Sequence, residues 1–314
     1  MELTREEIHF GRTQFHLLIY RSNGQQYQDL FVRIMSSRRA GFKTVKPHGK
    51  QGDRKNDGYE QEAGRYFQIY APENPSAAVA AAVKKAVEDF KGLKEFWEKV
   101  SPIREYRFAF NDKYLGPYPE IETALTQLGK ENGLAACGTF LAHDLLREFE
   151  QMDSAAMMDV VGLLPNPANL RSLDFNTFSE VLTFIVQTNV SLDTSQLNAA
   201  NFDEKIRFNG LSKEVGTLLT HGSFQSGAVR RFFDTIGKIS ASTIRDALAA
   251  IYDAKKESAA VANLPTDRRA DIIFFEILQD IMPHQTRQLQ DAAIVLMAHF
   301  FESCDIFEAP TLSI

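Results

Sequence analysis

The stretch Gly52-Asp53-Arg54-Lys55-Asn56-Asp57-Gly58-Tyr59, followed by Gln68-Ile69-Tyr70, decides how this chain is interpreted. Asp57 is predicted to close one strand, and the next strand is predicted to contain Gln68, because its surroundings are rich in residues that favour strands. Alternation along that strand places Gln68 and the tyrosine two residues later on one face. A polar side chain buried among aromatic residues is costly unless it is hydrogen-bonded or ligates a metal. Gln68 is therefore the foremost candidate for a site residue.

Oxygen-bearing side chains on two neighbouring strands suit a hard cation. Mg²⁺ takes oxygen ligands from one or two side chains and leaves its other positions to water and phosphate. Asp57 and Gln68 are the predicted metal ligands, with Mg²⁺ (or Mn²⁺) as the cofactor. The competing interpretation is that Asp53 and Asp57, with their neighbouring glycines, only build a hairpin turn. In that case Gln68 forms a hydrogen bond at the edge of the sheet.

Four short motifs extend this pattern over residues 27–72. They are Tyr27-Gln28-Asp29-Leu30, Gly41-Phe42, Gly52-Asp53 through Asp57, and Gln68-Ile69-Tyr70. In order and spacing they resemble the Mrr-like restriction-endonuclease branch of the PD-(D/E)xK nuclease superfamily. That resemblance implies a Mg²⁺-dependent endonuclease that cleaves DNA. Asp57 and Gln68 would hold the metal, and Gln28 would be a further ligand or would support one.

Two positions depart from the family pattern. Gln28 stands where the family has a helix carboxylate, and Tyr70 stands where it has a lysine that orients or activates the attacking water. Lys55, Lys50 or Lys46 is a candidate to supply the missing ammonium group. The alternative function is a non-catalytic adaptor that binds DNA and recruits an ATPase.

The basic residues are concentrated around these motifs, although the net charge of the chain is −6. Between Arg33 and Lys55 there are eight basic residues and one acidic residue, Asp53. Because phosphate groups bind Lys and Arg, this run is predicted to contact nucleic acid, unless it is only a solvated loop. The predicted nucleic-acid-binding residues are Arg38, Arg39, Lys43, Lys46, Lys50 and Arg54.

Strand-forming segments occur only in the first half of the chain. Residues 42–45, 65–70 and 106–111 are predicted strands, and 14–20 is either a strand or the start of a helix. Predicted helices cover residues 27–37, 76–100, 119–130, 134–152, 174–188, 211–221, 225–238, 240–258, 267–282 and 286–303. The Pro165-Asn166-Pro167 turn is the predicted boundary. The expected fold class is an α/β restriction-endonuclease-like nuclease domain at residues 1–165, followed by an all-α partner-binding domain at 166–314.

A wider resemblance suggests the partners. Residues 50–72 are similar to the nuclease effectors of bacterial ABC-three-component defence systems, of which Lamassu is one. Two later segments are similar to the C-terminal partner domains of that group: Lys205-Ile-Arg-Phe-Asn-Gly-Leu-Ser and Phe300-Phe-Glu-Ser-Cys-Asp-Ile-Phe-Glu. The resemblance implies an antiviral protein complex with an SMC-like ABC ATPase and a small middle subunit. Residues 272–278 and 294–301 are almost continuously apolar, which favours an interface with that ATPase or with a second copy of this chain. The alternative is that both helices are central to their own bundle.

The remaining features indicate a cytoplasmic protein. Two cysteines without a CxxC pair fit a reducing compartment, and no apolar run approaches the roughly 20 residues that span a bilayer. The polar N-terminus is not expected to be a signal peptide. No phosphate-binding glycine-rich motif occurs, so any ATP dependence is expected to come from a partner.

Overall fold

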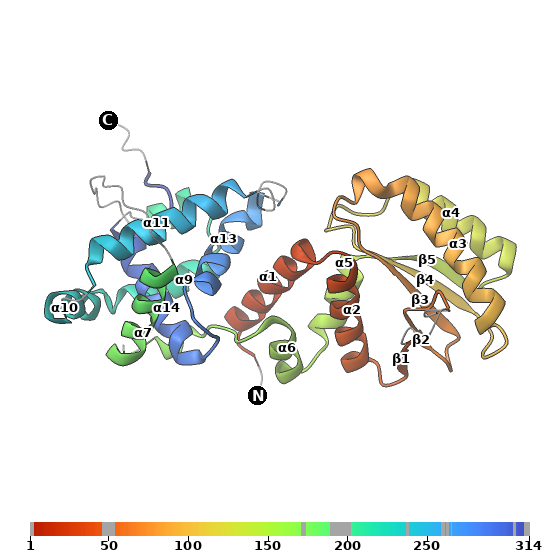
Figure 1. Cartoon of the computed structure of the whole chain (residues 1–314), viewed down its shortest axis with the longest axis horizontal. Coiled ribbons are helices and arrows are strands. Elements are labelled where there is room, and N and C mark those ends of the chain that lie inside the picture. Colours follow the sequence, from red (N-terminus) through yellow and green to blue (C-terminus); the bar gives the residue numbers. More distant parts are fainter. Residues whose placement is uncertain are drawn as a thin grey trace. The chain divides into compact units, whose positions relative to one another are not determined.

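The computed structural model describes residues 3–45, 54–170, 174–188, 202–236, 239–258, 261, 264, 266–303 and 306–310. The chain forms two compact units (Figure 1). One comprises Phe15–Val160, and the other comprises Met1–Gln14 together with Val161–Ile314. The division after Val160 lies close to the boundary expected at residue 165, whereas the first fourteen residues group with the helical unit. Helix α1 (Arg5–Arg21), which includes the ambiguous segment 14–20, continues across the division.

Helices and strands alternate in the unit formed by Phe15–Val160, which we call the α/β unit. Its elements are α2 (Gly24–Arg38), β1 (Phe42–Thr44), β2 (Gly58–Glu60), β3 (Arg65–Tyr70), η2 (Ser76–Ala78), α3 (Val79–Trp97), β4 (Glu105–Phe110), α4 (Pro119–Asn132), β5 (Ala136–Phe140), α5 (Ala142–Glu150) and α6 (Ser154–Val161). The five strands form one mixed sheet in the order β1-β2-β3-β4-β5. The first three strands are antiparallel, and the pairs β3–β4 and β4–β5 are parallel.

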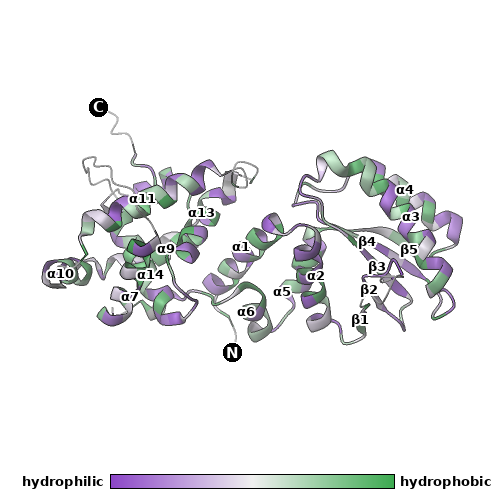
Figure 2. Cartoon of the chain, viewed as in Figure 1, coloured by the Kyte–Doolittle hydropathy of each residue, from purple (hydrophilic) through white to green (hydrophobic). Residues whose placement is uncertain are grey.

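Each face of the sheet is covered by a pair of helices (Figure 1). The face under α3 and α4 carries the even-numbered residues of β3 and β4, including Tyr66, Tyr106 and Phe108, which pack with Phe90 of α3. The opposite face, under α2 and α5, carries Phe67. Helices α3 and α4 each carry hydrophobic and hydrophilic residues (Figure 2), as expected for helices with one covered face. Successive residues of β3 thus lie on opposite faces of the sheet, as expected from the sequence.

Two expectations about local structure were wrong. Residues 134–152 form strand β5 and helix α5 instead of one helix. The five residues Ala136–Phe140 include glycine and alanine, so the segment has weak strand preference, and pairing with β4 determines its conformation. Asp57 precedes strand β2, which begins at Gly58, and does not close a strand.

The second unit, which we call the helical unit, contains no strand among its described residues. Its elements are η3 (Pro167–Asn169), α7 (Phe175–Thr188), α8 (Phe202–Phe208), α9 (Lys213–Ser223), α10 (Ser226–Ile236), α11 (Ala241–Glu257), α13 (Thr266–Asp280) and α14 (Arg287–Glu302). Helices α9, α11 and α14 each begin with a hydroxyl side chain that accepts a hydrogen bond from a backbone N–H three residues later, at Ser212, Ser240 and Thr286. A Cβ atom at Gly222 of α9 would lie 2.8 Å from Cβ of Ala298, so glycine allows α9 and α14 to approach closely.

The apolar segments of α13 and α14 lie inside this unit. The side chains of Phe274, Phe275, Leu296 and Phe301 are 0% exposed. These helices are therefore central to their own bundle, and the inference that they form a partner interface was wrong. A sequence pattern that is apolar most of the way round a helix does not distinguish burial within one chain from burial by another.

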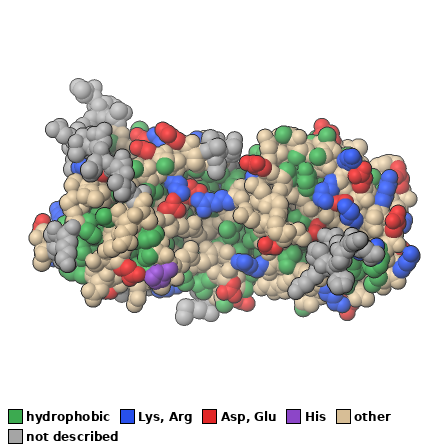
Figure 3. Space-filling model, in the orientation of Figure 1, with side chains coloured by type: hydrophobic (Ala, Val, Ile, Leu, Met, Phe, Trp, Pro, Cys, Tyr) green, Lys and Arg blue, Asp and Glu red, His purple; other side chains and the backbone are tan. Residues whose placement is uncertain are grey.

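The surface carries both signs of charge. Figure 3 shows Lys and Arg side chains interspersed with Asp and Glu side chains on the face in view. No helix within the described ranges is long and apolar enough to cross a membrane.

Candidate functional site

Helix α2 brings Gln28 to the start of strand β2. The helix buries Tyr27, Leu30 and Phe31 against the sheet, and Gln28 lies at the margin of that buried face. Its Nε2 atom donates a hydrogen bond of 2.9 Å to Oδ1 of Asp57. Asp29, the next residue, is exposed and points away, as helical phase predicts.

Asp57 is held by β3 as well as by α2. The backbone N–H of Ile69 donates to its Oδ2 at 2.6 Å, and the backbone N–H of Asp57 donates to the carbonyl of Phe67 at 3.1 Å. The side chain is only 5% exposed. A carboxylate with a donor on each oxygen retains further lone pairs, so this arrangement fixes Asp57 without removing its capacity to bind another group.

Gln68 lies on β3 beside Asp57. Gly58 pairs with Phe67 across the β2–β3 ladder, and the preceding residue on one strand therefore lies next to the following residue on the other. Gln68 is 4% exposed, and its Oε1 is buried without a hydrogen-bond partner among the described residues. An unpaired buried polar atom costs about 1–3 kcal/mol, so this oxygen is an acceptor without its expected partner.

The donor set fits a hard cation with few protein ligands. Asp57 offers a carboxylate and Gln68 an unpaired amide oxygen, both of the type that Mg²⁺ accepts. Within the described ranges, no group of three or more His, Cys, Asp or Glu side chains is placed to hold a metal ion. A metal here would thus take two or three side-chain oxygens and complete its coordination with water and substrate.

The side chains of Tyr70 and Lys55, the two residues considered in place of the family lysine, each contact other groups. The Tyr70 ring packs on Phe108 and Phe110, with centroids 6.2 and 6.1 Å away. Nζ of Lys55 lies 2.9 Å from Oδ1 of Asp89 on α3. Lys46 and Lys50, the other candidate lysines, lie outside the described residues.

Asp89 was not among the residues singled out from the sequence. It is buried on α3, where Lys55 and Lys85 both pair with its carboxylate. Burial raises the pKa of Tyr106, and the negative charges of Asp89 and Asp57 add to this rise. One signal was available in the sequence: Asp89 interrupts the apolar stripe of α3, three residues after Ala86.

The predicted nucleic-acid-binding residues that the structure describes differ in their contacts. Arg39 is committed to ion pairs with Glu60 and Glu148. Lys43 is exposed and contacts Gln61, and the guanidinium of Arg54 lies 4.7 Å from the centre of the Phe96 ring. Arg38 bonds Gln151. Lys46, Lys50 and Asp53 fall outside the described part of the chain.

Comparison with known proteins finds one family model that matches most of the helical unit. No curated protein and no solved structure matches the chain. Residues 177–308 match the family model of C-terminal domain 10 of the ABC-three component (ABC-3C) systems. The matched region begins within α7 and includes α8 to α14. This match supports the membership of the chain in an ABC-three component system, as a subunit that carries a C-terminal domain of that kind.

Proposed function

We propose that the chain is the metal-dependent nuclease subunit of an ABC-three component defence system and that it cleaves DNA phosphodiester bonds. The observation that carries this proposal is the buried, unpaired Oε1 of Gln68, on the β3 residue that neighbours Asp57 across the strands, together with the fixed carboxylate of Asp57. A helix followed by three antiparallel strands, with Gln28 on that helix bonded to Asp57, also supports it. This order of elements agrees with the order of motifs in the PD-(D/E)xK resemblance.

The side chains have distinct roles in this proposal. Asp57 and Gln68 hold Mg²⁺ or Mn²⁺, which would supply positive charge to the phosphate and lower the pKa of a bound water. Gln28 orients Asp57 through its 2.9 Å hydrogen bond. Lys55 is the described lysine nearest in sequence to Asp57, and its ammonium group, bound to Asp89, replaces the family lysine as the local positive charge. Asp89 then positions Lys55, and Tyr70 contributes packing at the end of β3.

Plasmid cleavage by the full chain tests the proposal, with Mg²⁺ or Mn²⁺ and with or without the other subunits of its operon. Asp57→Ala and Gln68→Ala should each abolish metal-dependent cleavage while the circular dichroism spectrum stays native. Asp29→Ala is the matched control, because Asp29 is an exposed acid on the same helix as Gln28 and should leave cleavage intact. Full cleavage by either site variant would refute the assignment.

A non-catalytic DNA-binding adaptor is the second candidate function. Two observations favour it: Tyr70 stands in place of the lysine and packs on aromatic residues, and the Lys55 ammonium group is already paired. An adaptor would bind DNA and recruit the ATPase but would leave plasmid intact with either metal and with every operon partner present.

The helical unit is proposed to bind the other subunits, namely an SMC-like ABC ATPase and a small middle subunit, or a second copy of this chain. Because α13 and α14 are buried, the docking residues must lie on the surface. The exposed aromatic residues of this unit are candidates, with Phe224 at 73% and Phe208 at 53% exposed. Phe224→Glu with Phe208→Glu should reduce co-purification of the partners. Leu115→Glu, at a 62% exposed residue of the α/β unit, is the control. Equal retention of partners by both variants would place the docking surface elsewhere.

A further inference from the structure

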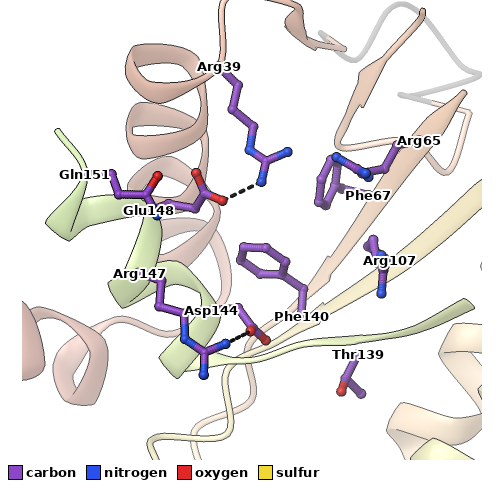
Figure 4. A pocket seen from close by; sticks show the side chains of 10 residues that line it. All are labelled: Arg39, Arg65, Phe67, Arg107, Thr139, Phe140, Asp144, Arg147, Glu148 and Gln151. Carbon is purple, nitrogen blue, oxygen red and sulfur yellow. Dashed lines mark hydrogen bonds and ion pairs between the residues drawn. The ribbon is translucent and has the colours of Figure 1, made fainter. Parts of the chain in front are cut away.

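A pocket of about 340 Å³ opens on the sheet face that α2 and α5 cover. Four arginines line it: Arg39, Arg65, Arg107 and Arg147. Figure 4 shows side chains of α5 on one side, those of β3 and β4 on the other, and Phe140 between them. None of Gln28, Asp57 and Gln68 lines the pocket, so it is separate from the candidate metal site.

Two of the four arginines are each held by ion pairs with two glutamates. Arg39 bridges Glu60 and Glu148, and Arg65 forks onto Glu105 at 2.8 and 3.1 Å while also contacting Glu60. The pKa of Arg39 is raised, chiefly by Glu148, as expected for a guanidinium group fixed by carboxylates. Arrangements of this kind join neighbouring elements and need no ligand to explain them.

Arg107 has fewer hydrogen bonds to carboxylates than Arg39 and Arg65 have. Among the residues that the structure describes, its one hydrogen bond runs from NH2 to Oε2 of Glu105 at 3.3 Å, and the same oxygen accepts a shorter bond from Arg65. Neither Nε nor NH1 of Arg107 has a hydrogen-bond partner among the described residues, and the side chain is 32% exposed. The pocket therefore contains a guanidinium group whose Nε and NH1 donors are unpaired among the described residues. Strand β4 holds this arginine in place.

Arg147 adds a second available cation from the other wall. Within the described part of the chain it pairs only with Asp144, three residues earlier on α5 (Figure 4). Its side chain is 73% exposed. Four carboxylates, Glu60, Glu105, Asp144 and Glu148, pair with the four arginines, so the affinity for an anion must come from the guanidinium donors that these carboxylates do not use. Guanidinium groups on opposite walls suit an anion that accepts several hydrogen bonds, as a phosphate does.

The floor of the pocket is apolar. Phe67 is buried, and Phe140 packs edge-on against it with ring centroids 5.9 Å apart. A volume of about 340 Å³ lies at the small end of the usual range for small-molecule sites, roughly 300–1,000 Å³. An anion bound to the arginines would thus have room for an attached ring system on Phe140.

We propose that this pocket binds the phosphate monoester of a nucleotide, with Arg107 and Arg147 contacting the phosphate and Phe140 contacting the nucleoside. Free nucleotides and the phosphorylated 5′ end of a strand share this chemistry. The site does not depend on the proposed nuclease activity, since no residue of the metal site lines it.

Calorimetric titration of the full chain tests the proposal, with inorganic phosphate, nucleoside 5′-monophosphates, and one oligonucleotide with and without a 5′-phosphate as probes. Arg107→Gln should weaken binding at least about tenfold, because it removes a charged hydrogen-bond donor. Arg147→Gln should weaken binding as well. Arg104→Gln, at an exposed arginine three residues before Arg107, should bind like the native chain.

The probes distinguish the two sources of the phosphate. Preference for the 5′-phosphorylated oligonucleotide over its unphosphorylated form identifies a strand end, and binding of monophosphates alone identifies a free nucleotide. Arg147 is exposed and has a single ion pair, so its variant tests the proposal even if Arg107→Gln fails to fold. The proposal is overturned if the native chain binds none of the phosphorylated probes. It is also overturned if folded Arg107→Gln and Arg147→Gln bind them as tightly as Arg104→Gln does.

Discussion

Nε2 of Gln28, on helix α2, lies 2.9 Å from Oδ1 of Asp57, at the start of strand β2. This bond joins two of the three residues that the sequence proposed for a metal site, across 29 positions of the chain. A neutral amide donates an N–H hydrogen bond to an ionised carboxylate, whereas two ionised carboxylates at this distance would repel each other. The amide at position 28 thus stabilises Asp57 in the absence of a metal.

The first prediction follows from that contact. Gln28→Glu should destabilise the metal-free protein by about 1–3 kcal/mol, because it replaces a donor with a second negative charge. The same variant should gain more thermal stability than the native chain when Mg²⁺ is added. Thermal unfolding with and without Mg²⁺ measures both effects. Gln28→Met, which removes the donor but adds no charge, is the control. Equal Mg²⁺-induced shifts in Gln28→Glu and Gln28→Met would contradict the prediction.

The second prediction concerns the basic residues that lie near the surface. Lys43→Gln combined with Arg54→Gln should weaken DNA binding regardless of sequence. The pair should also reduce the slope of log K against log[salt] by about 1.8, or about 0.9 for each lost phosphate contact. Lys84→Gln, at a 73% exposed side chain of α3, is the control. An unchanged slope in the double variant would mean that these residues are only solvated.

The third prediction tests the packing that places Asp57. A Cβ atom at Gly58 would lie 2.3 Å from Cζ of Phe42, so Gly58→Ala should destabilise the chain by about 1–3 kcal/mol. Phe42→Leu should relieve part of that cost in the double variant. Gly41→Ala is the matched control, since its Cβ would meet nothing within 4 Å. Denaturant unfolding gives the comparison, and strict additivity of the Gly58 and Phe42 effects would refute the clash.

The fourth prediction concerns pH. Burial on α14 raises the pKa of Asp291 to about 6, and Arg287 offsets this only in part. The folded state therefore favours the protonated acid, and the stability gained from protonation is lost as pH rises from the unfolded value of about 3.9 through 6. Asp291→Asn should be more stable than the native chain at pH 8, by about 1 kcal/mol after allowing for solvent screening. At pH 4 the difference should vanish. A constant difference in Tm between the two pH values would show that this carboxyl does not titrate as described.

Much of the α/β unit was predictable from local patterns. Period-3.6 apolar spacing identified α2, and aromatic and β-branched residues identified β3 and β4. Strand β5 was missed because Ala136–Phe140 has weak strand preference, and its pairing with β4 is a long-range contact that no local pattern contains. Gln28 was named as a site residue from the family resemblance, whereas Asp89 was overlooked because its partner Lys55 lies 34 residues away in the sequence. The pocket arginines are spread over four segments, so only the fold brings them together.

The most direct test of the central claim is a Mn²⁺ titration of the full chain, followed by electron paramagnetic resonance. The native protein and Asp29→Asn should bind Mn²⁺ with the same affinity. Asp57→Asn, which keeps the shape of the side chain but removes its charge, should bind at least about tenfold more weakly, the loss expected for one charged ligand. Equal affinity in the native protein and Asp57→Asn, or no Mn²⁺ binding by the native protein, would contradict the assignment of Asp57 as a metal ligand.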